Sequence, residues 1–212
     1  MTDTPALLSL MQWLSPAFPT GAFAYSHGLE WAISAGDVTD AAGAHLWLTD
    51  ILQHGTGWQD AVILAQGLRP QADFAALSDY ARALAPSRER LIESMEQGTA
   101  FARALRGLGH AVDPAPLPVA VGQASAQLGL PPCQVIALYL HAFAANLVSV
   151  AVRFVPLGQS QGQQIIAALH PVIIALAEDA AIADLCGLTT ATIGADLAAM
   201  RHETMDVRLY RT

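Results

Sequence analysis

The sequence predicts an all-α fold, a single-domain bundle of about ten helices that spans residues 1–212. Apolar residues recur at helical spacing along nearly the whole chain, alanine and leucine dominate, and the alternating runs typical of strands are scarce. A chain of 212 residues is long enough for one sizeable domain and short for two.

Turn and capping residues divide the chain into ten expected helices. They cover residues 5–14, 24–35, 40–53, 58–68, 71–84, 87–108, 117–128, 132–154, 159–185 and 195–209. Pro5 suits a first helical turn, and Ser15–Pro16 ends the first helix because the residue before a proline avoids helical backbone angles. Gly36 is expected to end the second helix, and Asp40 to cap the third.

The later boundaries follow the same chemistry. A glycine break precedes the fourth helix, Pro86 separates the fifth from the sixth, and Ser87 is a suitable N-cap. The segment 109–118 has three prolines and is expected to be a loop, and Gly129 ends the seventh helix. The eighth helix is apolar nearly all round, which predicts burial on all sides, and Pro171 predicts a bend in the ninth.

Charged residues are scarce in this sequence. They make up 13% of it, against about a quarter in ordinary domains, so we expect burial against protein partners, with a membrane as the alternative. The most apolar run, 135–152, is barely long enough to span a bilayer and carries His141, Asn146 and Ser149, which are costly against lipid. Because no signal peptide is visible, we expect a cytoplasmic protein that does not enter a membrane.

The charge and the residue types also exclude several functions. The net charge of −8 and the pI near 5.1 argue against nucleic-acid binding. The chain has no lysine, which a Walker phosphate loop and a Schiff-base enzyme both require. Cys133 and Cys186 form no CxxC pair and are expected to be free, buried thiols in a reducing compartment.

The histidines form no recognisable metal site. They make no HxH or HExxH motif, and His202, Glu203 and Asp206 supply too few ligands for a closed site. We interpret that segment as solvated or as a docking surface. His141 and Asn146 are either satisfied core groups or the lining of a water-filled passage. Both alternatives require hydrogen-bond partners, because an unpaired buried polar group costs ~1–3 kcal/mol.

No catalytic centre is evident either, so we predict that the chain is not an enzyme. The di-iron pattern of helical bundles is absent, and Glu89, Glu93 and Glu96, with arginines nearby, are interpreted as a solvated helix face. The alternative is an all-helical small-molecule hydrolase. It requires a deep pocket with paired carboxylates or a cysteine nucleophile near Cys133.

Four blocks of sequence resemble the UreF family of urease accessory proteins. The run LLSLMQWLSPAFPTGAFAYSHGLEWAISAGDV fits the family pattern S-P-x-x-P-x-G-x-[FY]-x-[YF]-S-x-G-[LI]-E. The fitting residues are Ser15, Pro16, Pro19, Gly21, Phe23, Tyr25, Ser26, Gly28, Leu29 and Glu30. The other blocks follow in order: SRERLIESMEQGTAFARAL, NLVSVAVRFVPLGQSQGQ and MRHETMDVRLYRT. Departures are Val150 for the usual alanine, and Asp206, Tyr210 and Thr212 in the last block.

The resemblance implies a non-catalytic, all-α protein that acts with other accessory proteins in urease maturation. The implied partners are a UreD-type protein (also called UreH), the UreG-type GTPase and apo-urease, to which the complex delivers nickel. The resemblance also implies a homodimer that bridges the UreD-type partner and the GTPase. No cofactor is expected to be bound tightly, since the complex handles the nickel.

Within this resemblance three segments are expected to matter for partners. The loop segment, placed near the GTPase, comprises Arg153, Pro156, Leu157, Gly158 and Gln159. The C-terminal segment, placed against the UreD-type partner, includes His202, Glu203, Arg208, Leu209 and Arg211. In the opening segment, residues 15–31, Phe18, Phe23 and Trp31 are expected to pack inward. Tyr25, Ser26 and Glu30 are expected to be structural or to lie near the homodimer contact.

Overall fold

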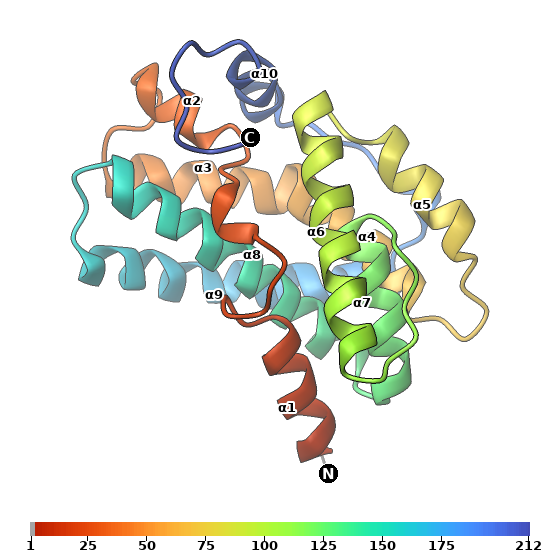
Figure 1. Cartoon of the computed structure of the whole chain (residues 1–212). Helices are drawn as coiled ribbons and strands as arrows, with labels where there is room; N and C mark the ends of the chain where they lie inside the picture. Colours follow the sequence, from red (N-terminus) through yellow and green to blue (C-terminus); the bar gives the residue numbers. More distant parts are fainter. Residues whose placement is uncertain (1–2) are drawn as a thin grey trace.

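The computed structural model describes residues 3–212, which contain ten α-helices and three short 3-10 helices joined by turns and loops (Figure 1). The α-helices are α1 (Thr4–Trp13), α2 (Leu29–Ser34), α3 (Ala41–His54), α4 (Thr56–Gly67), α5 (Phe74–Ala83), α6 (Arg88–Gly107), α7 (Leu117–Ser125), α8 (Pro132–Phe154), α9 (Gln159–Ile182) and α10 (Ile193–His202). The 3-10 helices are η1 (Ala22–Ala24), η2 (Ala126–Leu128) and η3 (Leu185–Gly187). Residues 3–212 contain no strand, which confirms the all-α prediction.

Helices α8 and α9 form the centre of the bundle. A short connection, 155–158, joins them, and they lie side by side (Figure 1). Helices α3 and α4 pack against α9, α6 packs against α7, and α10 lies on α2. Helix α1 projects from one end of the molecule (Figure 1).

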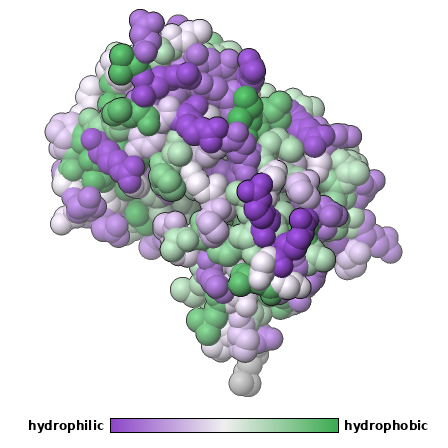
Figure 2. Space-filling view, in the orientation of Figure 1, coloured by the Kyte–Doolittle hydropathy of each residue, from purple (hydrophilic) through white to green (hydrophobic). Residues whose placement is uncertain are grey.

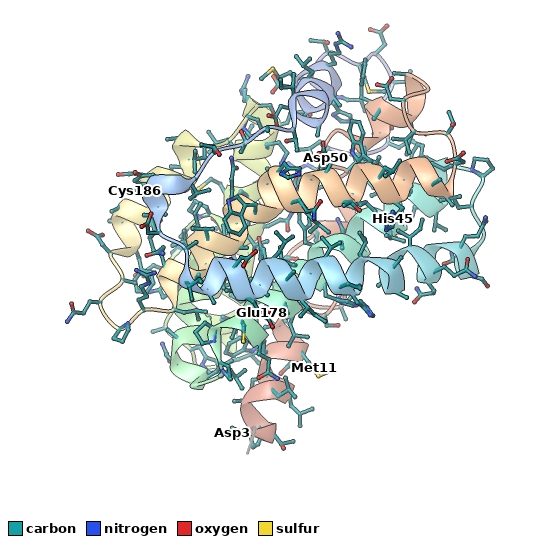
Figure 3. The ribbon with its side chains drawn as sticks, turned by 180° about the vertical axis from the view of Figure 1, so that it is seen from behind. Asp3, Met11, His45, Asp50, Glu178 and Cys186 are labelled. Atoms are coloured by element: carbon teal, nitrogen blue, oxygen red, sulfur yellow. The ribbon has the colours of Figure 1, made fainter. Side chains whose placement is uncertain are left out.

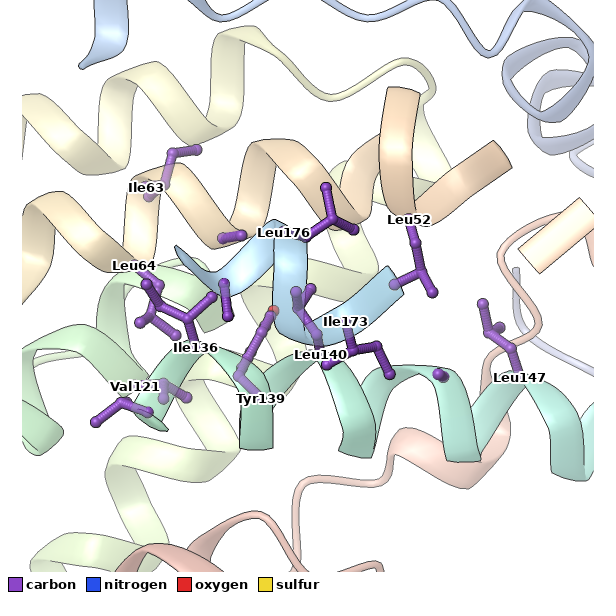
Figure 4. Packing of buried hydrophobic residues seen from close by; sticks show 14 of the residues in the cluster. Leu52, Ile63, Leu64, Val121, Ile136, Tyr139, Leu140, Leu147, Ile173 and Leu176 are labelled. Atoms are coloured by element: carbon purple, nitrogen blue, oxygen red, sulfur yellow. The ribbon is translucent and has the colours of Figure 1, made fainter. Parts of the chain in front are cut away.

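One continuous cluster of buried side chains fills the space between these helices. Figure 4 shows side chains from several helices converging in it. The largest fully buried side chains are Leu10, Leu29, Leu48, Leu52, Ile63, Leu64, Phe101, Leu105, Ile136, Leu140, Leu147 and Leu169. Because burying one large apolar side chain contributes about 1.5–3 kcal/mol, this cluster fixes the relative positions of the helices that carry the polar residues described below.

The capping residues act as predicted. The Asp40 carboxylate accepts the Gly43 N–H at 2.7 Å, and the Ser87 hydroxyl accepts the Arg90 N–H at 3.2 Å. Gly129 follows η2 with a positive φ of 66°, a left-handed conformation that glycine adopts without a Cβ penalty. Helix α9 is continuous across Pro171.

The helix expected over residues 24–35 is shorter than predicted. Its helical part begins only at Leu29, because His27 and Gly28 both have positive φ, at 58° and 74°. A right-handed helix cannot contain two such residues in succession. Gly28 also lies against α10, since a Cβ at this position would be 2.5 Å from the Ala199 nitrogen.

The helix expected over residues 195–209 is also shorter and ends at His202. Backbone N–H groups of the following residues bind elsewhere, since Leu209 and Tyr210 donate to Glu30 and Arg211 donates to the Ala24 carbonyl. Donors used in this way cannot form the hydrogen bonds of a helix.

Two predictions of burial are wrong. Cys133, in the first turn of α8, and Cys186, in η3, are both exposed. Figure 3 shows Cys186 on the connection after α9. Helix α8 is not buried on all sides either, since Ser149 and Arg153 are exposed. The apolar residues of α8 extend around more of its surface than the neighbouring helices cover.

Helices α8 and α9 are long and apolar enough to cross a membrane by length and composition alone, with mean hydropathies of 2.0 and 1.8. Half of the α8 window and a third of the α9 window are buried inside the molecule, at 50% and 33%. Central helices of a folded core pass the same test of length and composition, so this finding is weak support for a membrane span.

Candidate functional site

Four glutamates hold the last residues of the chain against α2 and α6. We call Glu30, Glu89, Glu93 and Glu96, together with the residues of segment 202–212 that they bind, the tail network. Glu30 is only 3% exposed. Its carboxylate accepts the backbone N–H groups of Leu209 at 2.8 Å and Tyr210 at 2.9 Å.

His202 lies at the centre of the tail network with no exposed surface. Its Nδ1 is 2.7 Å from a Glu89 oxygen and its Nε2 is 3.1 Å from a Glu30 oxygen. Each ring nitrogen that carries a proton donates to the carboxylate beside it, because a carboxylate only accepts hydrogen bonds. His202 is therefore a buried cross-link, which corrects its interpretation as part of a solvated segment. Asp206 is exposed.

Of the three glutamates of α6 that were expected on a solvated face, Glu96 is exposed, Glu89 is partly buried and Glu93 is buried, so that expectation is wrong for Glu93. Glu93 is 1% exposed, forms an ion pair with Arg90, and has a carboxylate oxygen 2.9 Å from the His27 Nδ1. Burial alone raises the pKa of the Glu93 carboxyl, but the Arg90 guanidinium and His27 outweigh it and hold that pKa at about 2. The Thr212 hydroxyl donates to Glu93 at 2.6 Å.

Glu96 and Glu89 bind the exposed arginines of the segment. Arg211 pairs with Glu96 at 2.8 Å, and Arg208 pairs with Glu89. The Tyr25 hydroxyl donates to Glu96 at 2.5 Å, and burial followed by that hydrogen bond raises the pKa of Tyr25.

The opening segment also binds the last residues of the tail network, through Ser26. The Ser26 N–H donates to the Thr212 carbonyl at 2.8 Å, and the Ser26 hydroxyl donates to the same oxygen. The Glu203 carboxylate, from the last block, accepts the Glu89 N–H at 3.2 Å at the start of α6, where the helix dipole favours a negative charge.

The structure thus brings together most residues that the sequence analysis placed in three separate segments. Arg153 joins them, since it donates to the Tyr210 hydroxyl at 3.2 Å. The rest of the loop segment does not take part in the tail network: Pro156, Gly158 and Gln159 are exposed, as expected of a loop.

The aromatic residues of the opening segment differ in burial. Phe18 is buried, with its ring centroid 5.5 Å from that of Phe101. Trp31 is half-buried beneath the Arg201 guanidinium, at 4.8 Å from the ring centroid. Phe23 is 68% exposed, so its predicted inward packing is wrong. Its neighbours in η1 are themselves partly open to solvent.

A cavity of about 120 Å³ lies between the opening segment, α6 and α8, and the sequence analysis did not predict it. Its polar lining includes Asp60, Glu93, Arg90 and His27. Tyr139 donates to Asp60 at 2.7 Å, and burial raises the pKa of the Asp60 carboxyl to about 6. One charged residue within an apolar helix, Asp60 in α4, was the sequence signal for this site.

His27 is strained and incompletely paired. It is the one non-glycine residue among residues 3–212 with a positive φ, a conformation that clusters at functional sites. Burial, followed by the nearby Arg90 charge, lowers the pKa of its ring. The ring Nε2 and the Arg90 Nε are buried without a partner. The cavity has room for several waters that could satisfy them.

His141 and Asn146 do not share a common passage in the described residues. Asn146 lines the cavity and donates to the Tyr25 carbonyl at 3.4 Å. His141 is absent from that lining and instead faces His170 of α9. Across residues 3–212, no group of three or more His, Cys, Asp or Glu side chains is placed to hold a metal ion.

Fold and site together define a class of protein, a helical bundle in which a network of ionisable side chains cross-links distant segments of the chain. The chain belongs to the UreF family, whose family model matches residues 38–170.

Curated relatives named "Urease accessory protein UreF" match over nearly the full chain. The protein of Cereibacter sphaeroides (strain ATCC 17029 / ATH 2.4.9) is 62% identical over 208 residues, covering 98% of this chain and 99% of the relative. That of Paracoccus denitrificans is 54% identical over 213 residues, covering 100% and 99%. That of Ruegeria pomeroyi is 47% identical over 213 residues, covering 97% and 96%.

Proposed function

We propose that this protein is a non-catalytic accessory factor in the maturation of urease. The observation that carries the proposal is the 62% identity, over 98% of the chain, to a protein named "Urease accessory protein UreF". The tail network adds to it, because most of the ionisable groups in it are already paired with one another.

The C-terminal segment is the proposed contact for a UreD-type partner. The tail network holds its backbone in place while Val207 and Leu209 remain 77% and 76% exposed. Ile193 and Met200 of α10 are also exposed, at 71% and 47%. Exposed apolar side chains on an ordered backbone suit an interface, because docking them costs little conformational entropy.

The loop segment is the proposed contact for a UreG-type GTPase. It is an exposed connection between the two central helices, and such loops commonly carry binding residues. Through Arg153 it is linked to Tyr210 of the C-terminal segment. This link supports a bridging role, in which both partners bind one ordered region.

The remaining parts of the proposal concern assembly and cargo. Leu8 and Met11 on α1 and Phe23 in η1 are exposed, which supports a homodimer or a larger assembly. Figure 2 shows green, hydrophobic surface on the projecting end of the molecule that α1 forms. We place the protein in the cytoplasm as one domain, acting with apo-urease, without a tightly bound cofactor and away from membranes and nucleic acid. Nickel is the cargo of the complex in this proposal.

One observation favours the alternative, a small-molecule hydrolase. The cavity holds two carboxyl groups, Asp60 and Glu93, whose pKa values are shifted in opposite directions. Both are engaged, however: Asp60 by Tyr139, and Glu93 by Arg90 and His27. Cys133 is exposed and does not line the cavity.

The decisive experiment is gene deletion in a urease-producing host. We expect the deletion strain, grown with nickel, to make urease protein that contains little nickel and has little activity, and the restored gene to recover both. Restoration by a gene carrying Asp60→Asn would exclude a hydrolase that uses this carboxylate. Full urease activity in the deletion strain would contradict the proposal.

A further inference from the structure

A histidine pair lies on the surface between the two central helices. His141 of α8 and His170 of α9 have ring centroids 5.6 Å apart and ring planes inclined by 38°. His141 is half-buried and His170 is exposed, so the pair is open to solvent. Neither ring belongs to the tail network or lines the cavity, and neither ring has a hydrogen bond to another residue within 3–212.

The separation of the rings suits two ligands of one ion. Imidazole nitrogens bind zinc-like ions at about 2.0–2.1 Å, so two rings that share a tetrahedral ion have centroids roughly 5 Å apart. The exposed His170 can rotate by the small amount that separates this value from 5.6 Å. The backbone supporting the pair is rigid, because α8 and α9 pack closely along their length (Figure 1).

The protonation state also suits ligation. A metal ligand must be a neutral imidazole. Burial lowers the pKa of His141, and the nearby His170 lowers it further. Both effects favour the neutral ring of His141. Within residues 3–212, the ion pairs of histidines with carboxylates involve His27 and His202, and neither ring of the pair.

We propose that His141 and His170 form a two-histidine site for a divalent transition-metal ion of the Ni²⁺ or Zn²⁺ type, with water in the remaining positions. Imidazole suits ions of this group. Two protein ligands are fewer than the three or four of catalytic and structural sites, so the ion is held loosely and exchanges readily. The inference concerns this chain alone and does not depend on the proposed function.

The test is a titration of the full-length protein, without a polyhistidine tag, with NiCl₂ by isothermal calorimetry. We expect one site in the unaltered chain, and His141→Ala and His170→Ala each to weaken it by at least ~10-fold, since even loss of a supporting contact has that effect. His54→Ala is the matched control, because His54 is also exposed and is the last residue of α3, not part of α8 or α9.

Circular dichroism and thermal unfolding of each variant establish that the bundle is intact. Binding that is unchanged in both pair variants, or weakened equally by His54→Ala, would overturn the proposal. So would the absence of binding by the unaltered chain at millimolar Ni²⁺. As a second readout, the EPR spectrum of one equivalent of Cu²⁺ should show nitrogen ligands that are lost in His141→Ala.

Discussion

Glu30 is a single carboxylate that binds three donors from a segment more than 170 positions later in the chain. It accepts two backbone N–H groups and the Nε2 of His202. Hydrogen bonds to a charged acceptor contribute about 1.5–3 kcal/mol each, roughly twice the neutral value. This one residue therefore determines the path of the chain after α10.

The substitution Glu30→Gln should release the C-terminal segment. A glutamine amide has one acceptor oxygen and an NH₂ group that would face an N–H donor, so one of the three donors that Glu30 binds loses its partner. We expect the free energy of unfolding to fall by about 3 kcal/mol, measured by urea denaturation, and residues 203–212 to lose hydrogen-exchange protection. Glu178→Gln on the exposed face of α9 is the control (Figure 3) and should change neither.

Asp60 gives a second residue-scale prediction, on pH dependence. Its folded-state pKa near 6 lies above the ordinary 3.8, so the folded state favours the protonated carboxyl. Stability from Asp60 is thus fully present below pH 4 and is lost as the pH rises through 6. Allowing for its partial exposure to the cavity, we expect this loss to be about 2 kcal/mol.

The measurement is the free energy of unfolding of Asp60→Asn and of the unaltered chain between pH 4 and pH 7. The variant should gain stability relative to the unaltered chain as the pH rises, because asparagine keeps the Tyr139 hydrogen bond without the buried charge. Parallel curves across this range would show that Asp60 does not titrate as stated. Glu93, with its lowered pKa, acts in the opposite sense and only at lower pH.

At the scale of elements, the sequence predicted those helix ends that depend on hydrogen bonds between residues close together in the chain. The caps at Asp40 and Ser87 and the glycine ends follow from backbone hydrogen bonding within a few residues. The end of α10 could not be predicted from nearby residues. Glu30, which is remote in the sequence, binds backbone N–H groups after His202 that a longer helix would need for its own hydrogen bonds. The burial of Glu93 was missed for the same reason, since its partners His27 and Thr212 come from other segments.

The contact between α2 and α10 depends on Gly28. Gly28→Ala should destabilise the fold both through its positive φ and through the clash with the Ala199 backbone. Gly36 has a similar φ of 84° but open space around it, so Gly36→Ala measures the backbone strain alone. We expect both variants to lose about 1 kcal/mol from strain, and Gly28→Ala to lose a further 1–3 kcal/mol or so. Equal losses in thermal unfolding would contradict the close packing.

The loop between α8 and α9 is predicted to bind without stabilising the fold. Pro156 and Gln159 are exposed, so Pro156→Ala with Gln159→Ala should leave the unfolding temperature nearly unchanged. In a pull-down we expect the double variant to retain less UreG-type GTPase than the unaltered chain. The exposed Gln164→Ala, one turn further along α9, should retain it fully. Undiminished recruitment by the double variant would remove the loop from the proposal.

At the scale of the whole molecule, the tail network unites α2, α6, α10 and the last residues into one surface. A truncation after Met200 would remove His202 and Tyr210, which are buried, and so would disturb the fold as well as the surface. A sharper test replaces only exposed side chains. Val207→Ser with Leu209→Ser should abolish co-elution with a UreD-type partner while the unfolding temperature stays within the usual range for surface changes.

The matched control for this variant is Ile182→Ser, because Ile182 is 84% exposed at the end of α9 and is not part of the tail network. It should co-elute with the partner as the unaltered chain does. Equal retention of the partner by the Val207/Leu209 variant would place the UreD-type contact elsewhere on the molecule.

The long separation between Glu30 and its donors has a consequence for synthesis. Glu30 leaves the ribosome 179 residues before Leu209, so its carboxylate has no native backbone partner while most of the chain is being made. Closing so long a loop is slow, and early segments fold before late ones appear. The helical core can assemble first, and the surface around residues 202–212 is completed only once those residues have emerged. A partner that binds this surface therefore cannot bind a chain in which these residues have not yet been synthesised.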